Sequence, residues 1–284
     1  MRINRNLLGL HTAVILLGMT GLFGKFLDIH PTAIIAGRSF FTAISVYLLL
    51  KFLRVKVAIP INREFGLLFL SGVLLAGHWF AFFHSIQLST VAIGVLGFST
   101  YPVFVTLLEP LFFREALRSR DIFSACLVFI GLMIISPSID ISNAQTLALA
   151  WAIFSGFILS VFTLLNRQIV KQHHFLVITF YQHTAATLCI LPLVWVVSSW
   201  PSANEVLGLM LLGVLFTAVP QSLLVRSLKK VKAQLVSVVV GLEPLYAIVF
   251  AAILLNEIPE TSTILGGGII LVAVGFAMKS HAPK

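Results

Sequence analysis

Residues 89–115 read STVAIGVLGFSTYPVFVTLLEPLFFRE, and residues 231–257 read VKAQLVSVVVGLEPLYAIVFAAILLNE. The two stretches begin 142 positions apart, which is half of the 284-residue chain. Both are apolar, and two prolines and two terminal glutamates match at this spacing: Pro102 with Pro244, and Glu115 with Glu257. A fixed spacing shared by several features indicates an internal duplication.

The composition is that of an integral membrane protein. Hydrophobic residues make up 59 % of the chain and charged residues 10 %, and the mean hydropathy is +1.05. The charges gather between apolar runs of about 20 residues, each long enough to cross ~30 Å of hydrocarbon as a helix. Backbone in lipid must satisfy its own hydrogen bonds, so helices are expected, and the alternating segments of a membrane barrel are absent.

We predict an all-α integral membrane fold with ten transmembrane helices in two inverted five-helix repeats. The expected repeats are residues 1–142 and 143–284. Because five crossings are an odd number, the second repeat enters the membrane the other way up. The first apolar run is too long for a signal peptide and lacks a cleavage site. The predicted spans are 7–27, 31–53, 65–86, 89–113, 119–136, 145–165, 175–199, 204–226, 233–255 and 262–279.

The basic residues predict the orientation. If the amino terminus is cytoplasmic, 17 of the 19 lysines and arginines lie in cytoplasmic segments; the other two are Lys25 and Arg38. This asymmetry predicts that both termini are cytoplasmic. The formal charge of +9 is therefore an orientation signal and poor support for a nucleic-acid partner, although the basic inner face could favour anionic lipid.

Two similar halves around one central site can open that site to either side of the membrane by nearly equivalent movements. This arrangement suits transport by alternating access, and an enzyme or receptor has no comparable need for it. The Pro102/Glu115 and Glu243-Pro244/Glu257 patterns, with glycines in the fifth and tenth spans, resemble the drug/metabolite transporter superfamily, in its ten-helix form with two EamA-type domains. The resemblance implies a secondary transporter of small organic metabolites in a bacterial inner membrane. One departure is that Tyr101 occupies the position equivalent to Glu243, so the site is not charge-symmetric.

Polar and aromatic side chains inside the spans are the candidate substrate ligands. Glu243 is the first of them: it could bind a substrate amine or carry a proton. Alternatively, it could donate to a carbonyl left free by Pro244. The third span supplies an aromatic wall suited to an amphipathic solute, although a helix–helix interface would use the same residues. The other candidates are His78, Trp79, Phe82, Tyr101, Asn166, Gln182, His183, Gln221 and Tyr246.

A second group of charged residues is expected at gates and helix ends. Arg38 could pair with Asp28 or Glu243. Glu115 and Glu257 are expected to anchor helix ends or gates, and an interfacial ion pair with Arg114 is expected for Glu109. The glycines at 266–268 are expected at close helix contacts, and a homodimer contact is the alternative.

Catalytic and metal motifs are missing from the sequence. It has no Walker-type loop, HExxH pattern, GxSxG elbow or metal-spaced carboxylate–histidine cluster, and its two cysteines lie inside spans. We therefore expect neither an enzyme nor a bound cofactor or metal. The alternatives are a nucleotide-sugar or sugar-phosphate carrier, which would need more basic residues inside spans, and a membrane-embedded lipid-handling enzyme. The favoured substrate is an amino acid or a related neutral-to-cationic metabolite, moved by efflux.

Overall fold

The computed structural model describes residues 5–57, 63–113, 119–135, 140, 142–197, 201–229, 236 and 239–281. These residues form helices joined by short turns and contain no strand. The helices are α1 (Arg5–Thr20), α2 (Phe23–Phe26), α3 (Pro31–Phe52), α4 (Arg63–Leu88), α5 (Val91–Phe98), α6 (Tyr101–Phe113), α7 (Ser119–Ile135), α8 (Ala144–Ile169), α9 (Phe175–Val197), α10 (Ala203–Gly213), the π-helix η1 (Val214–Ala218), α11 (Val219–Leu228), α13 (Glu243–Leu254) and α14 (Thr261–His281).

Seven helical stretches of the described chain are long and apolar enough to cross a bilayer, and three shorter apolar helices accompany them. The protein is therefore an all-α, multi-pass membrane protein, as the sequence predicts. The predicted spans coincide with helices to within a few residues, except the ninth, whose first part (233–242) lies partly outside the described residues and whose described helix α13 begins at Glu243. Several of the spans are interrupted. The fourth breaks between α5 and α6, directly before Pro102, because proline lacks the N–H that a continuous helix needs.

Polar residues cap the N-terminal ends of helices that begin on the side of the bundle opposite the two chain termini. Thr90 caps α5 by accepting a hydrogen bond from the Ile93 backbone N–H. Ser202 and Glu205 form a reciprocal capping box at the start of α10. Each cap satisfies backbone N–H groups that a helix end leaves without a partner.

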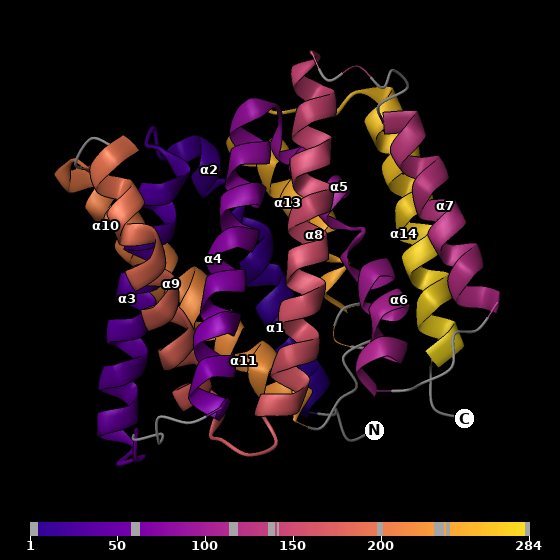
Figure 1. Ribbon diagram of the computed structural model, residues 1–284. Coiled ribbons are helices and arrows are strands. Elements are labelled where there is room, and N and C mark those ends of the chain that lie inside the picture. The colour runs from indigo at the N-terminus through magenta and orange to yellow at the C-terminus, as the bar shows by residue number, and fades with distance from the viewer. Residues whose placement is uncertain are drawn as a thin grey trace.

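The packing of the helices repeats with the sequence duplication. α4 packs against α8, and the equivalent pair in the duplicated half, α11 and α1, also packs together. Likewise, α5 and α6 contact α8 while α13 contacts α1, and α4 contacts α9 while α10 contacts α3. The equivalent helices α3 and α9 pack on each other, as do α7 and α14 at one edge of the bundle (Figure 1). Exchanging the halves therefore leaves the contact pattern unchanged, as a pseudo-two-fold axis requires.

The second half is turned over relative to the first. In Figure 1, α1 begins and α14 ends at the lower side of the bundle, whereas α7 ends and α8 begins at the upper side. The equivalent helices α1 and α8 therefore run in opposite directions, and the pseudo-two-fold axis lies in the membrane plane. We call the lower side the termini side and the upper side the far side.

Glycines allow close contacts of α14 with α7 and α5. A Cβ atom added to Gly266 would lie 2.5 Å from the carbonyl oxygen of Gly131, and one added to Gly267 would lie 2.9 Å from Leu96. Gly268 has no atom within 4 Å of such a Cβ. Two of the three consecutive glycines thus serve packing within the chain, which agrees with the close-packing interpretation.

Candidate functional site

A cavity lies between the two halves at the middle of the bundle. Its volume is about 60 Å³, well below the roughly 300 Å³ at which typical ligand pockets begin. In this conformation it has room for a few water molecules and is too small for a metabolite. Its lining is Leu17, Thr20, Arg38, Leu75, His78, Trp79, Phe82, Phe98, Tyr101, Leu159, Phe162, Thr163, Gln221, Leu224, Val225, Leu228, Val236, Val240 and Glu243.

The lining follows the duplication residue by residue. Six pairs of lining residues are separated by the repeat spacing of 142 positions. They are Leu17 with Leu159, Thr20 with Phe162, Trp79 with Gln221, Phe82 with Leu224, Phe98 with Val240, and Tyr101 with Glu243. Because the members of each pair face the same space, the cavity lies on the pseudo-two-fold axis.

The cavity nevertheless extends further on the termini side. Thr163, Leu228 and Val236 line it there. Their equivalents on the far side are Gly21, Ile86 and Gly94, which pack together instead: a Cβ added to Gly94 would lie 2.6 Å from Ile86, and one added to Gly21 would lie 3.4 Å from it. We call these three residues the far-side seam; none of them lines the cavity.

A larger apolar hollow of about 420 Å³ lies between α6, α7 and α8. Its polar lining consists of two threonines, Thr100 and Thr146, and Phe129 on its wall is largely exposed on the outer surface of the bundle. A site for a polar metabolite needs several convergent polar groups, so the central cavity is the better candidate.

Arg38 is completely buried at the wall of the cavity. Its Nε and Nη2 atoms donate to the hydroxyl of Thr217, at 3.2 and 2.9 Å. The guanidinium carbon lies 3.9 Å from the ring centroid of Trp79, in cation–π geometry. Nη1 has no hydrogen-bond partner among the described residues. The expected ion pair is not formed, because neither Asp28 nor Glu243 brings a carboxylate oxygen within 4.0 Å of Arg38.

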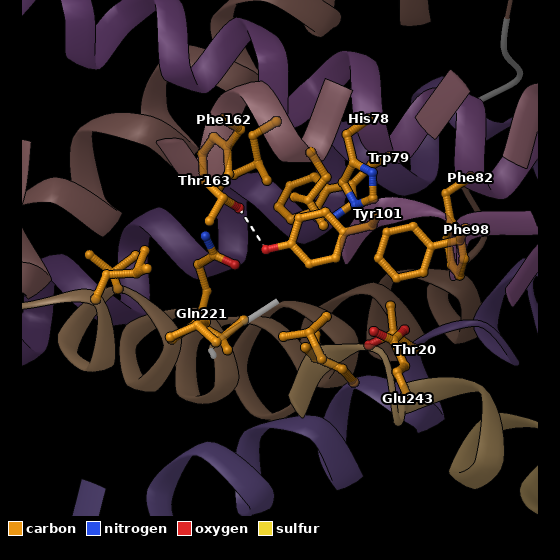
Figure 2. Close-up of a pocket in the computed structure, with 18 of the residues that line it drawn as sticks. Thr20, His78, Trp79, Phe82, Phe98, Tyr101, Phe162, Thr163, Gln221 and Glu243 are labelled. Carbon is orange, nitrogen blue, oxygen red and sulfur yellow. Dashed lines mark hydrogen bonds between the residues drawn. The ribbon is translucent and has the colours of Figure 1, made fainter. Parts of the chain in front are cut away.

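Glu243 and Tyr101 occupy equivalent positions and face the cavity with different chemistry. Glu243 is the first residue of α13 and is 5 % exposed, and its carboxylate accepts no hydrogen bond from the described residues. The alternative bond to a carbonyl freed by Pro244 is also not formed. The Tyr101 hydroxyl is 2.9 Å from that of Thr163, and its ring stacks on Phe98 with centroids 5.8 Å apart (Figure 2).

The aromatic wall comes from α4 and α5. His78 and Phe82 both lie within ring-contact distance of Phe98, with centroids 5.5 and 5.6 Å away. The Nδ1 atom of His78 is 2.7 Å from the hydroxyl of Ser155 on α8, which fixes the ring. Figure 2 shows His78 and Trp79 on one side of the cavity and Glu243 on the opposite side. The candidates His78, Trp79, Phe82, Tyr101, Gln221 and Glu243 are thus brought together.

The other four binding candidates do not line the cavity. Gln182 donates to Asn166 and to Ser71 in a buried network that joins α9, α8 and α4. The ring of His183 contacts the ring of Trp79, with centroids 5.2 Å apart, but His183 itself does not line the cavity. Tyr246 lies against α1, where a Cβ added to Gly18 would be 2.7 Å from its Cβ. The sequence marked all four because lipid penalises polar groups, but helix contacts meet that need as well as a cavity does.

The gate candidate Glu257 lies in the link between α13 and α14. Glu257 accepts hydrogen bonds from the Val91 backbone N–H at the start of α5, at 3.1 Å from each oxygen, and Lys25 donates to the Ser89 carbonyl at 2.6 Å. Both contacts hold the link between α4 and α5 on the far side. Glu115 lies outside the described residues.

Near the termini side, an ion pair joins α6 to α8. Glu109 is fully buried and pairs with Arg167, whose guanidinium carbon lies 4.1 Å from the ring centroid of Phe113. An ion pair for Glu109 is therefore confirmed. The partner predicted from the sequence, Arg114, lies outside the described residues.

Several residues that line the cavity were not among the candidates predicted from the sequence: Phe98, Phe162, Thr163, Leu159 and Leu17. All are apolar or weakly polar, so nothing separates them from lipid-facing residues in a single sequence. The repeat spacing could have found most of them, because it relates Phe98 to Val240 and Leu17 to Leu159.

The described residues contain no cluster of histidine, cysteine, aspartate or glutamate that could hold a metal ion. A helical bundle of two repeats around a central cavity is an architecture found in many membrane transporters. A sequence model of the EamA-like transporter family matches residues 5–136 and 146–278. The chain belongs to this family, and it is a transporter rather than an enzyme.

Similar proteins carry transporter names. The chain is 24 % identical over 237 residues to the pseudopaline exporter CntI of Pseudomonas aeruginosa, covering 83 % of this chain and 82 % of that protein. It is 24 % identical over 212 residues to the uncharacterized transporter YxxF of Bacillus subtilis, covering 73 % and 67 %. A solved crystal structure shares the fold, with a TM-score of 0.74, 17 % identity and 99 % of both chains covered.

Proposed function

We propose that this protein is a secondary transporter that moves a small organic metabolite across a bacterial inner membrane by alternating access. The observation that carries the proposal is the pairing of lining residues by the repeat spacing. Such a cavity belongs equally to both halves, so two related movements of the halves can expose it to either side. The boundary between the repeats is taken at about residue 142.

The difference between the two ends of the cavity supports two alternating conformations. Thr163, Leu228 and Val236 leave space on the termini side, whereas their equivalents in the far-side seam are packed. In a symmetric pair of repeats, the opposite arrangement is built from the same kinds of contact. The conformation described is therefore the one whose cavity reaches toward the termini side, and the second conformation closes there and opens the seam.

The distribution of basic residues favours a cytoplasmic location for both termini. With this orientation, the cavity described extends toward the cytoplasm, where an exporter collects its substrate. Efflux is the direction we propose, and the similarity to an exporter supports it. A homodimer is compatible with the open face of Gly268.

The lining supports an amino acid or a related amphipathic solute as substrate. Aromatic rings from α4 and α5 offer stacking surface, while Glu243, Gln221 and Arg38 offer polar contacts. A sugar-phosphate or nucleotide-sugar carrier would need several cations to hold phosphate. Arg38 is the single basic residue in the described lining, so that alternative is disfavoured.

The test is transport by purified protein in liposomes. Proteoliposomes loaded with a mixture of amino acids and related metabolites, without nucleotide, are diluted into buffer, and the solutes released are identified by mass spectrometry. The proposal expects release of specific solutes well above that from empty liposomes. Release that requires ATP, or none for any solute in the mixture, would contradict it.

Two variants localise the activity to the cavity. Trp79→Ala and Glu243→Gln are expected to reduce the transport rate at least 10-fold while the protein remains folded. The matched controls are Trp195→Ala, at a side chain 69 % exposed on the outer surface, and Glu260→Gln, at the exposed start of α14. The controls should transport at the wild-type rate; equal effects of cavity and control variants would remove this cavity as the transport site.

A further inference from the structure

We propose that the cavity binds a zwitterion, with Arg38 holding its anionic group and Glu243 its cationic group. The inference rests on the proposed transport function and names the substrate class within it. The class is a small amphipathic molecule that carries one carboxylate and one ammonium group.

Arg38 is built as an anchor for an anion. Two of its donors are used by Thr217, and its guanidinium plane is supported by Trp79, so the group is held in place before a ligand arrives. The remaining Nη1 is buried and without a partner in the described structure. A buried donor without an acceptor is costly, and a ligand carboxylate satisfies it with a charge-assisted hydrogen bond. Because the side chain is already ordered, binding does not have to fix it.

Glu243 supplies the opposite charge to the same cavity, where it lies opposite His78 and Trp79 (Figure 2). Its carboxylate has no hydrogen-bond partner among the described residues, and it makes no salt bridge with Arg38. A direct pair would neutralise both groups and leave nothing for a ligand. Instead, both charged groups line the same cavity without a hydrogen bond or salt bridge between them, and a molecule carrying both signs can bridge them.

The two charges come from different repeats and have no charged equivalents. Arg38 corresponds to Phe180, and Glu243 corresponds to Tyr101. A zwitterion held by both therefore links the first half of the chain to the second. A ligand with a single charge would leave the other buried group without a partner, which is a strong basis for discrimination.

The remaining lining sets the shape of the rest of the molecule. The stacked rings of Phe98 and Tyr101, with Phe82 and Leu224, form an apolar wall suited to a hydrocarbon or aromatic side chain. The test therefore uses two probe series of matched side chains. One is L-phenylalanine, phenethylamine and 3-phenylpropionate; the other is L-leucine, 3-methylbutylamine and 4-methylpentanoate.

Binding of each probe to the full-length purified protein is measured by isothermal titration calorimetry. In at least one series, the amino acid should bind about 10- to 100-fold more tightly than either relative that lacks one charge. Equal binding of all three members in both series, or no binding of either amino acid, would overturn the proposal. This comparison uses the wild-type protein and does not depend on whether a variant folds.

Two variants assign the charges to their residues. Arg38→Gln should abolish the preference for the amino acid over the amine, and Glu243→Gln should abolish the preference over the carboxylate. Arg38→Gln should keep the preference for the amino acid over the carboxylate, and Glu243→Gln should keep the preference over the amine. A general loss of structure would remove both preferences. A folded variant that loses both preferences, keeps both or loses the wrong one would overturn the assignment. If the liposome assay finds transport of another solute while the wild-type preference is absent, the proposed function stands and this inference fails. If the liposomes release nothing, the proposed function itself fails.

Discussion

At the scale of single residues, the site combines groups that are fixed by the protein with groups left free for a ligand. Tyr101, Thr163 and His78 are held by hydrogen bonds to neighbouring helices, whereas Glu243 and one nitrogen of Arg38 are not. Fixed polar groups hold the shape of the wall, and the free ones are available for recognition. The two kinds should respond differently to substitution.

Tyr101→Phe tests a fixed group. The substitution removes the hydrogen bond to Thr163, and a buried neutral hydrogen bond contributes about 1 kcal/mol. The free energy of unfolding in mixed micelles should fall by about this amount. Tyr47→Phe, at a residue 38 % exposed, should change it by less than ~0.5 kcal/mol. If Tyr101→Phe lowers the free energy of unfolding no more than Tyr47→Phe does, the hydrogen bond does not stabilise the fold.

At this scale, single-sequence reasoning selects residues that are both charged and deep in a span, because lipid penalises charge. Glu243, predicted as a substrate ligand, and Arg38, predicted as a gate residue, both line the cavity. The same reasoning selected Gln182 and Asn166, which bond to each other instead. Sequence shows that a polar group needs a partner, but the partner can be another helix as easily as a ligand, and only the packing decides.

At the scale of helices, close contacts depend on glycine at a few positions. The crossing of α7 and α14 brings Gly131 and Gly266 together, with no space for a side chain on either. The sequence predicted close packing at the three consecutive glycines but not which of them pack, because one turn of helix places them on different faces.

Gly266→Ala should destabilise this crossing. Its new Cβ would lie 2.5 Å from the Gly131 carbonyl oxygen, so the helices must move apart, at a cost of about 1–3 kcal/mol. Gly268→Ala is the matched control: it has open space, and alanine favours the helix, so the protein should be unchanged or slightly stabilised. Thermal unfolding of the two purified variants checks this, and an equal drop in both would refute the assigned packing.

Gly94→Val should open the far-side seam. The residue equivalent to Gly94 in the second repeat is Val236, which lines the cavity, whereas a Cβ on Gly94 would meet Ile86 at 2.6 Å. A valine there acts as a wedge and should favour the conformation that opens on the far side. The measurement is the rate at which an impermeant maleimide modifies a cysteine placed at Leu17, in a background without Cys126 and Cys189.

Labelling from the far side should become several-fold faster in Gly94→Val than in the parent. Gly66→Val, where a side chain meets nothing within 4 Å, should leave the rate unchanged. Slower or unchanged labelling in Gly94→Val would show that the seam does not close the cavity.

At the scale of the whole molecule, the duplication accounts for most of what the sequence could predict. Composition indicated the membrane, and the matching of Pro102 with Pro244 indicated two repeats. The odd number of crossings indicated that the second repeat is inverted. The contacts between equivalent helices match in the two halves. The contracted cavity and its extension toward the termini side could not be predicted. They depend on the packing of equivalent residues that differ between the repeats, such as Gly94 against Ile86 on the far side and Val236 at the cavity on the termini side.

The central claim, a cavity shared by inverted repeats and opened to each side in turn, is tested most directly by two-sided labelling. A cysteine replaces Leu159, a lining residue, in the background without native cysteines, and an impermeant maleimide is applied to right-side-out and to inverted membrane vesicles. Phe129→Cys, 64 % exposed on the outer surface of the bundle, is the control and should be labelled from neither side. The account predicts labelling of the Leu159 position from both sides. Labelling from one side alone, whatever solute is present, would contradict it.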